Sequence, residues 1–134
     1  MSTSLAHITI VPGGEARFEE LTRQLFTATH ATEPGCLRYE YWRAQEPGRY
    51  YTLLSFDDFE AFLAHQTSDH HEEATSELRT LIESIRVEWL DPVQGASDLP
   101  PSLAADAPAD ADETTARYAR MFAVDVADWW LPLR

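Results

Sequence analysis

Two neighbouring segments, residues 36–43 and 50–56, are rich in aromatic and aliphatic side chains and are separated by the turn sequence Glu46-Pro47-Gly48. Such side chains favour strands, and a short connection containing Pro-Gly joins antiparallel strands, so the sequence predicts a β-hairpin. Because side chains alternate between the faces of a strand, both faces of this hairpin carry large groups. Leu37, Tyr39 and Tyr41 point one way and Cys36 and Trp42 the other, while Tyr51 and Leu53 oppose Tyr50, Leu54 and Phe56.

The two apolar faces of the hairpin constrain how the chain assembles. Helices can cover one face of a sheet, and the other face then remains in water. Burial of apolar surface contributes roughly 25 cal/mol per Å². We therefore expect a second copy to pack sheet to sheet, which gives a homodimer.

The segments around the hairpin alternate between the period of a strand and the period of a helix. Apolar residues recur at spacings of three and four from Phe18 to Ala28, which is typical of a helix. The expected elements are a strand at 5–11 before Pro12-Gly13-Gly14, a helix from Glu15 to the residue before Pro34-Gly35, the hairpin, helices capped by Asp57 and Ser68, and a strand at 85–90. This βαββαβ order predicts a ferredoxin-like α+β domain, with four antiparallel strands and helices on one face.

The composition changes after this domain, which we place at residues 1–95. Residues 96–113 are rich in Pro, Ala and Asp and predict an acidic linker. Residues 114–134 become apolar again and form a C-terminal extension. Helical and strand periodicity both fit this segment; we favour a helix that docks on the body of its own subunit or on the partner.

The charge and the cysteine count exclude several classes of function. The formal net charge is −13, from 23 acidic residues against ten basic residues that are all Arg. Binding to nucleic acid or to an anionic membrane depends on clustered cations, so neither partner is expected. The lone Cys36 excludes an intrachain disulfide and a multi-cysteine metal site. Neither an export signal nor a membrane span is recognisable, and we expect a cytoplasmic protein.

Three histidines within seven residues, His65, His70 and His71, form the most concentrated chemical signal. They fit a metal site poorly, because adjacent helical positions diverge by about 100°. They fit proton transfer better, since an imidazole titrates near pH ~6.5. They could also simply cap helices at the surface. Arg38 and Arg49 lie on or beside the hairpin, where they could pair with carboxylates or stabilise an anionic oxygen.

Several short stretches together resemble the antibiotic biosynthesis monooxygenase (ABM) superfamily, particularly its quinol monooxygenase-like branch. They are Val11-Pro12-Gly13, the run from Glu33-Pro34-Gly35 to Tyr39-Glu40, and Ala64-His65-Gln66 with Ser68 and His70-His71. The resemblance covers residues 5 to about 99. It implies a dimeric α+β barrel of two ferredoxin-like subunits, with a cavity between sheet and helices in each. It also implies oxidation of an electron-rich phenol, hydroquinone or polyketide-type aromatic by O2 to a quinone, with no cofactor and no metal.

The resemblance suggests roles for particular residues. A phenol of pKa about 10 facing an imidazole near 6.5 leaves a gap of about 5 kcal/mol, so a base alone does not suffice and the site must also stabilise the anion. Two other functions stay open: a small aromatic ligand-binding or accessory dimer without catalysis, and a haem-binding or haem-degrading protein with His70 or His71 as axial ligand. The candidates are His65 or His70 as base, Arg38 or Arg49 as anion stabiliser, and Trp42, Tyr51, Phe62, Tyr39 and His71 as substrate-binding residues.

Overall fold

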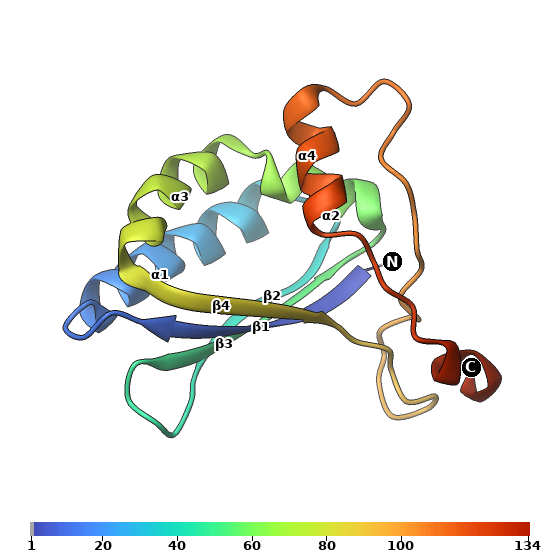
Figure 1. Ribbon diagram of the computed structural model, residues 1–134, viewed down its shortest axis with the longest axis horizontal. Helices are drawn as coiled ribbons and strands as arrows, with labels where there is room; N and C mark the ends of the chain where they lie inside the picture. Colours follow the sequence, from blue (N-terminus) through green and yellow to red (C-terminus); the bar gives the residue numbers. More distant parts are fainter. Residues whose placement is uncertain (1) are drawn as a thin grey trace.

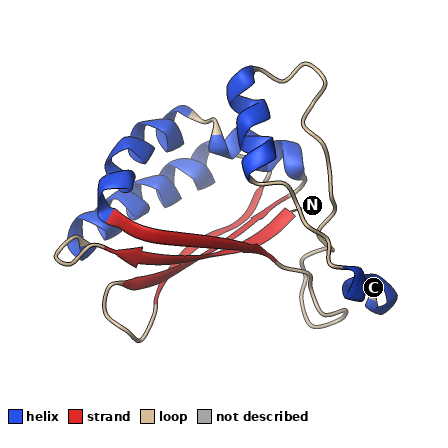
Figure 2. Ribbon diagram, in the orientation of Figure 1, coloured by secondary structure: helices blue, strands red, loops and turns tan. Residues whose placement is uncertain are grey.

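The computed structural model describes residues 2–134 as a four-stranded antiparallel sheet with helices on one face (Figures 1 and 2). The strands lie in the order β2-β3-β1-β4. This arrangement confirms the ferredoxin-like α+β prediction. The elements are β1 (Ser2–Ile10), α1 (Glu15–Thr32), β2 (Cys36–Arg43), β3 (Arg49–Phe56), α2 (Phe59–Gln66), α3 (Asp69–Leu81), β4 (Ile82–Trp89), α4 (Glu113–Met121) and the short 3-10 helix η1 (Asp128–Leu133).

The first strand begins earlier than its apolar pattern indicates. Ser2, Thr3 and Ser4 are buried and pair with the end of β3, and the Thr3 and Ser55 hydroxyls form a 2.8 Å hydrogen bond. Hydroxyl side chains satisfied in this way are as compatible with a buried strand as apolar ones. A count of apolar residues alone therefore places the start of β1 too late. β4 likewise starts at Ile82 and not at Ile85.

The hairpin forms as predicted, but one end of β2 faces differently. The register of β2 against β3 shifts between Cys36 and Arg38, so one extra residue is inserted there. Cys36 consequently packs on the same core cluster as Tyr39 and Tyr41, although strict alternation places it on the opposite face. Trp42 lies opposite Tyr51 in the register, and both are exposed on the outer face of the sheet, at 59% and 39%.

The junction between α2 and α3 is fixed by caps that differ in detail from the prediction. Asp58, and not Asp57, caps α2, because its carboxylate accepts a 2.7 Å hydrogen bond from the Ala61 backbone N–H. Ser68 occupies the N-cap position of α3 without a side-chain cap bond. Its hydroxyl instead donates to the His65 carbonyl oxygen at 2.8 Å. This bond ties the last turn of α2 to the start of α3.

The C-terminal segment packs against the domain through α4. Tyr118, Ala119 and Val124 are buried in the same cluster as α2 and β3 side chains. The indole N–H of Trp89 donates to the Ala123 carbonyl at 2.9 Å, and Arg134 pairs with Asp91 at 2.7 Å. Figure 1 shows α4 beside α2, on the helical side of the sheet. Within residues 2–134, no helix has both the length and the apolar character needed to span a membrane.

Candidate active site

A cavity of about 490 Å³ lies between the helix-facing side of the sheet and the helices α1–α4. All four strands contribute to its wall, through residues such as Ala6, Tyr39, Thr52 and Val87. The exposed surface of the lining is mostly apolar, and it is interrupted by polar side chains that include Thr52, His65 and His71. A cavity of this size and character suits a small aromatic molecule.

Three buried polar atoms of the described chain have no hydrogen-bond partner: Thr52 Oγ1, His65 Nε2 and His71 Nδ1. All three belong to residues that line this one cavity. A buried polar atom left unpaired costs about 1–3 kcal/mol, and such atoms are concentrated at functional sites. A ligand that carries hydrogen-bonding groups would pair with them.

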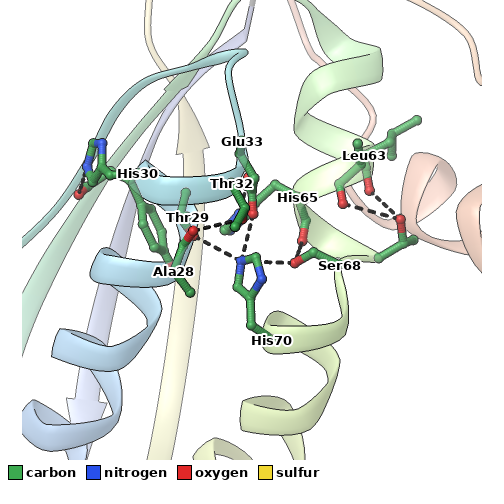
Figure 3. A network of polar contacts seen from close by, with 12 residues as sticks. Ala28, Thr29, His30, Thr32, Glu33, Leu63, His65, Ser68 and His70 are labelled. Carbon is green, nitrogen blue, oxygen red and sulfur yellow. Dashed lines mark hydrogen bonds and ion pairs between the residues drawn. The ribbon is translucent and has the colours of Figure 1, made fainter.

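One carboxylate joins two of the predicted histidines (Figure 3). Glu33, at the end of α1, accepts a 2.9 Å hydrogen bond from Nδ1 of the fully buried His65. It also lies 2.7 Å from Nε2 of His70, which the hydroxyls of Thr29 and Ser68 approach at 3.2 Å. Burial alone would raise the pKa of Glu33. The hydrogen bond and charge of His65, together with those of His70, have a larger opposite effect, so the net result is a lowered pKa. Glu33 is therefore an ionised acceptor for both rings at neutral pH.

The bond to Glu33 determines which nitrogen of His65 is left without a hydrogen-bond partner. With Nδ1 donating to the carboxylate, Nε2 of the neutral ring carries the lone pair. The carboxylate also stabilises the imidazolium that forms when Nε2 takes up a proton. A carboxylate bound to one imidazole nitrogen, with the other nitrogen unpaired, is an arrangement compatible with proton transfer.

His71 lines the same cavity but differs chemically from His65. Burial, followed by the positive charge of His65, lowers the pKa of His71 to about 4. His71 is therefore neutral at neutral pH and a weak base. His71 can therefore act as a neutral hydrogen-bonding group in the wall of the cavity.

Two tyrosines provide neutral donors in the wall of the cavity. The hydroxyls of Tyr39 and Tyr41 lie 2.6 Å apart, and both residues line the cavity. Burial raises the pKa of Tyr41 to about 12, and burial together with the neighbouring Tyr41 also raises the pKa of Tyr39. Both stay protonated, and only one of the two O–H groups can donate within the pair. The other is available to a ligand oxygen.

The structure brings some of the predicted site residues together and places others elsewhere. The predicted residues that line the cavity are His65, His71, Tyr39 and Phe62. His70 does not line it, but its ring contacts the Glu33 carboxylate. The remaining predicted residues do not line it. Arg38 pairs with Asp98, Arg49 pairs with Glu46, and Trp42 and Tyr51 lie on the outer face of the sheet.

The reason for this separation is the alternation of side chains on β2 and β3. Tyr39, Tyr41 and Thr52 face the helices, so the neighbours Trp42 and Tyr51 face away. Sequence reasoning did not single out Glu33, whose role depends on α1 ending where α2 and α3 meet. It also missed the two arginines that do line the cavity, Arg79 and Arg117.

Glu33, His65 and His70 are also the residues that could hold a metal ion, since their ligand atoms all lie within 4.8 Å of one another. In the structure both rings point their nitrogen atoms at the carboxylate, at hydrogen-bonding distance. These hydrogen bonds account for the cluster as it stands.

Comparisons with known proteins agree with this architecture. The family model of the antibiotic biosynthesis monooxygenases matches residues 1–77. A solved Caulobacter crescentus structure assigned provisionally to this family is 28% identical, with a TM-score of 0.65 over 69% of this chain and 90% of that one. No curated protein sequence gives a significant match.

Two further solved structures share the fold at lower identity. A Pseudomonas aeruginosa protein is 24% identical, with a TM-score of 0.62 over 66% of this chain and 90% of that one. A Mycobacterium tuberculosis protein is 21% identical, with a TM-score of 0.64 over 72% of this chain and 98% of that one. Since the family model spans more than half of its 134 residues, the chain belongs to the antibiotic biosynthesis monooxygenase family.

Proposed function

We propose that the protein is a cofactor-independent monooxygenase that oxidises an electron-rich phenol, hydroquinone or polyketide-type aromatic with O2 to a quinone. The observation that carries the proposal is the buried His65, whose Nδ1 is held by Glu33 and whose unpaired Nε2 belongs to the wall of the cavity. Family membership supports a monooxygenase or small-molecule-binding role in general. The residues of the cavity support this particular chemistry.

In the proposed reaction His65 removes a proton from a hydroxyl or from an adjacent C–H group of the substrate. The pKa gap between a phenol and an ordinary imidazole corresponds to about 5 kcal/mol. A hydrogen bond to a charged group contributes about 1.5–3 kcal/mol, so two donors to the new anion close most of that gap. The free O–H of the Tyr39–Tyr41 pair and the Thr52 hydroxyl are the donors we assign. They replace Arg38 and Arg49 in this role.

The substrate itself supplies the electrons. The anion passes one electron to O2, the two radicals combine at carbon, and loss of water leaves the quinone. One oxygen atom of O2 enters the product and the other leaves as water. The protein's part is to generate the anion, hold it and keep the cavity dry.

The proposal includes a homodimer in the cytoplasm. The outer face of the sheet exposes Trp42 and Tyr51, and a second copy packed there would cover them. The single Cys36 is a free thiol, which suits a reducing compartment.

Oxygen uptake tests the proposal. Purified protein is supplied with a panel of hydroquinones and anthrones in the presence of a chelator, and oxygen consumption is followed with an electrode. We expect consumption that His65→Asn lowers strongly and that His30→Asn, a control at an exposed position of α1, retains. Background uptake with every substrate, alongside measurable ligand binding, would favour the non-catalytic ligand-binding function and contradict the proposal.

A further inference from the structure

Most arginines of the chain form an ion pair with a carboxylate, and a few do not. Ten arginines face 23 acidic residues, so an arginine without a partner is unexpected. Seven form ion pairs with Asp or Glu: Arg17, Arg23, Arg38, Arg43, Arg49, Arg86 and Arg134. Over residues 2–134, the three that form none are Arg79, Arg117 and Arg120.

Two of these three unpaired arginines line the cavity. Arg79 comes from α3 and Arg117 from α4, whereas Arg120, one turn further along α4, does not line it. Glu83 also lines the cavity, yet it forms no ion pair with either arginine in the described part of the chain. The cavity is thus bordered by two arginines that form no direct ion pair with a carboxylate, and by one carboxylate, Glu83.

The two arginines act on the same part of the cavity. The guanidinium of Arg117 lies 5.1 Å from the centre of the Tyr118 ring, and the charges of Arg117 and Arg79 both act on the Tyr118 hydroxyl. That hydroxyl donates to Glu72 on α3 at 2.5 Å, which fixes α4 against α3. This bond therefore sets how the α3 and α4 backbones that carry Arg79 and Arg117 lie relative to each other.

We propose that Arg79 and Arg117 bind a carboxylate carried by the aromatic substrate. This inference rests on the proposed function and specifies its substrate class, a hydroxylated aromatic acid. Guanidinium groups bind carboxylates through paired, charge-assisted hydrogen bonds, and both arginines are free to make them. The hydroxylated ring would then reach the Tyr39, Thr52 and His65 part of the cavity.

Arg79 lies on α3, an element that the family match over residues 1–77 reaches, whereas Arg117 lies on α4, well beyond it. The contribution of Arg117 to carboxylate recognition would therefore depend on the C-terminal segment that follows the family domain. Figure 1 shows the α4 segment that provides Arg117 after the long loop that follows β4. According to this proposal, the C-terminal segment forms one wall of the binding site and helps to select the substrate.

A binding experiment tests this inference separately from catalysis. The probes are a hydroxynaphthoic acid with its hydroxyl and carboxyl groups at opposite ends, and the primary amide of the same acid, which differs mainly in charge. Affinities are measured by fluorescence titration with the wild type, Arg79→Gln, Arg117→Gln and the double variant. Arg120→Gln is the matched control, since it removes an unpaired arginine of α4 that does not line the cavity.

We expect the acid to bind the wild type at least fivefold more tightly than the amide. Each single variant should weaken binding of the acid by about 3–5-fold, as expected for charges near the surface, and the double variant should abolish the preference. Amide binding and the Arg120→Gln variant should be unaffected. Equal binding of the two probes, binding of neither, or a preference that survives in the double variant would overturn the inference.

The outcomes separate this inference from the proposed function. A protein that binds the acid through both arginines and consumes no oxygen would retain the carboxylate site without the monooxygenase activity. If the protein oxidises only uncharged quinols, and the double variant does so at the same rate, the proposed function stands and the carboxylate site is refuted.

Discussion

The stability of the fold should depend on the protonation of His71 in a pH range where the carboxylates do not titrate. His71 is mostly buried in the cavity wall, its Nδ1 has no partner, and its pKa is lowered to about 4 from 6.5. The folded protein therefore favours the neutral ring. His71→Gln replaces the titrating group with a polar side chain that stays uncharged at every pH.

The sign and size of the effect follow from proton linkage. A histidine with a lowered folded pKa contributes stability above its unfolded pKa and loses it as pH falls toward the folded value. With pKa values of 6.5 and about 4, His71 costs the fold about 2 kcal/mol between about pH 7.5 and pH 5. Partial exposure of the ring reduces this to about 1–2 kcal/mol. The lowered pKa of Glu33 acts mainly below about pH 5, at the lower end of this range, and Glu33 is present in both proteins.

Urea unfolding followed by tryptophan fluorescence measures this difference. The wild type should lose about 1–2 kcal/mol more than His71→Gln between about pH 7.5 and pH 5, because the two proteins differ only in this side chain. Equal losses in the two proteins would refute the view that the cavity holds His71 neutral.

Three further predictions concern the site and the C-terminal segment. Glu33→Gln should lower the rate of oxygen uptake by about 10²–10⁴-fold while the circular dichroism spectrum stays unchanged, because His65 loses the group that orients it; a variant with full activity would contradict this. Tyr118→Phe removes the hydrogen bond to Glu72 and should lower the free energy of unfolding by about 1 kcal/mol. The C-terminal segment should also become more sensitive to limited proteolysis. Unchanged cleavage would mean that this bond does not hold α4 in place. Burial and the charge of Glu33 raise the pKa of Cys36 to about 11, so iodoacetamide at about pH 8 should modify it about 100-fold more slowly than a free cysteine, and an ordinary rate would be the contrary result.

The sequence predicted the elements of the fold well where periodicity was strong. The helix over 15–32 and the hairpin have clear apolar patterns, and their boundaries agree with α1, β2 and β3 within about one residue. The start of β1 was missed because its buried hydroxyls carry no apolar signal. The face of Cys36 was missed because the register shift that follows it depends on pairing between strands.

The site was predictable only in part, for a related reason. The histidine cluster indicated proton chemistry, and His65 and His71 do line the cavity. The arginines near the hairpin pair with nearby carboxylates, whereas the two at the cavity come from α3 and α4, far from the hairpin in sequence. Which residues share a cavity is set by the packing of helices on the sheet, and local sequence patterns do not carry that information.

The central claim is that Glu33 acts through His65 as one catalytic unit, and a double-mutant cycle on oxygen uptake tests it most directly. Rates are measured for the wild type, His65→Asn, Glu33→Gln and the double variant with the same hydroquinone. If Glu33 works by orienting His65, the double variant should be no slower than His65→Asn alone. Losses that multiply in the double variant, or a His65→Asn protein that keeps the wild-type rate, would contradict the account.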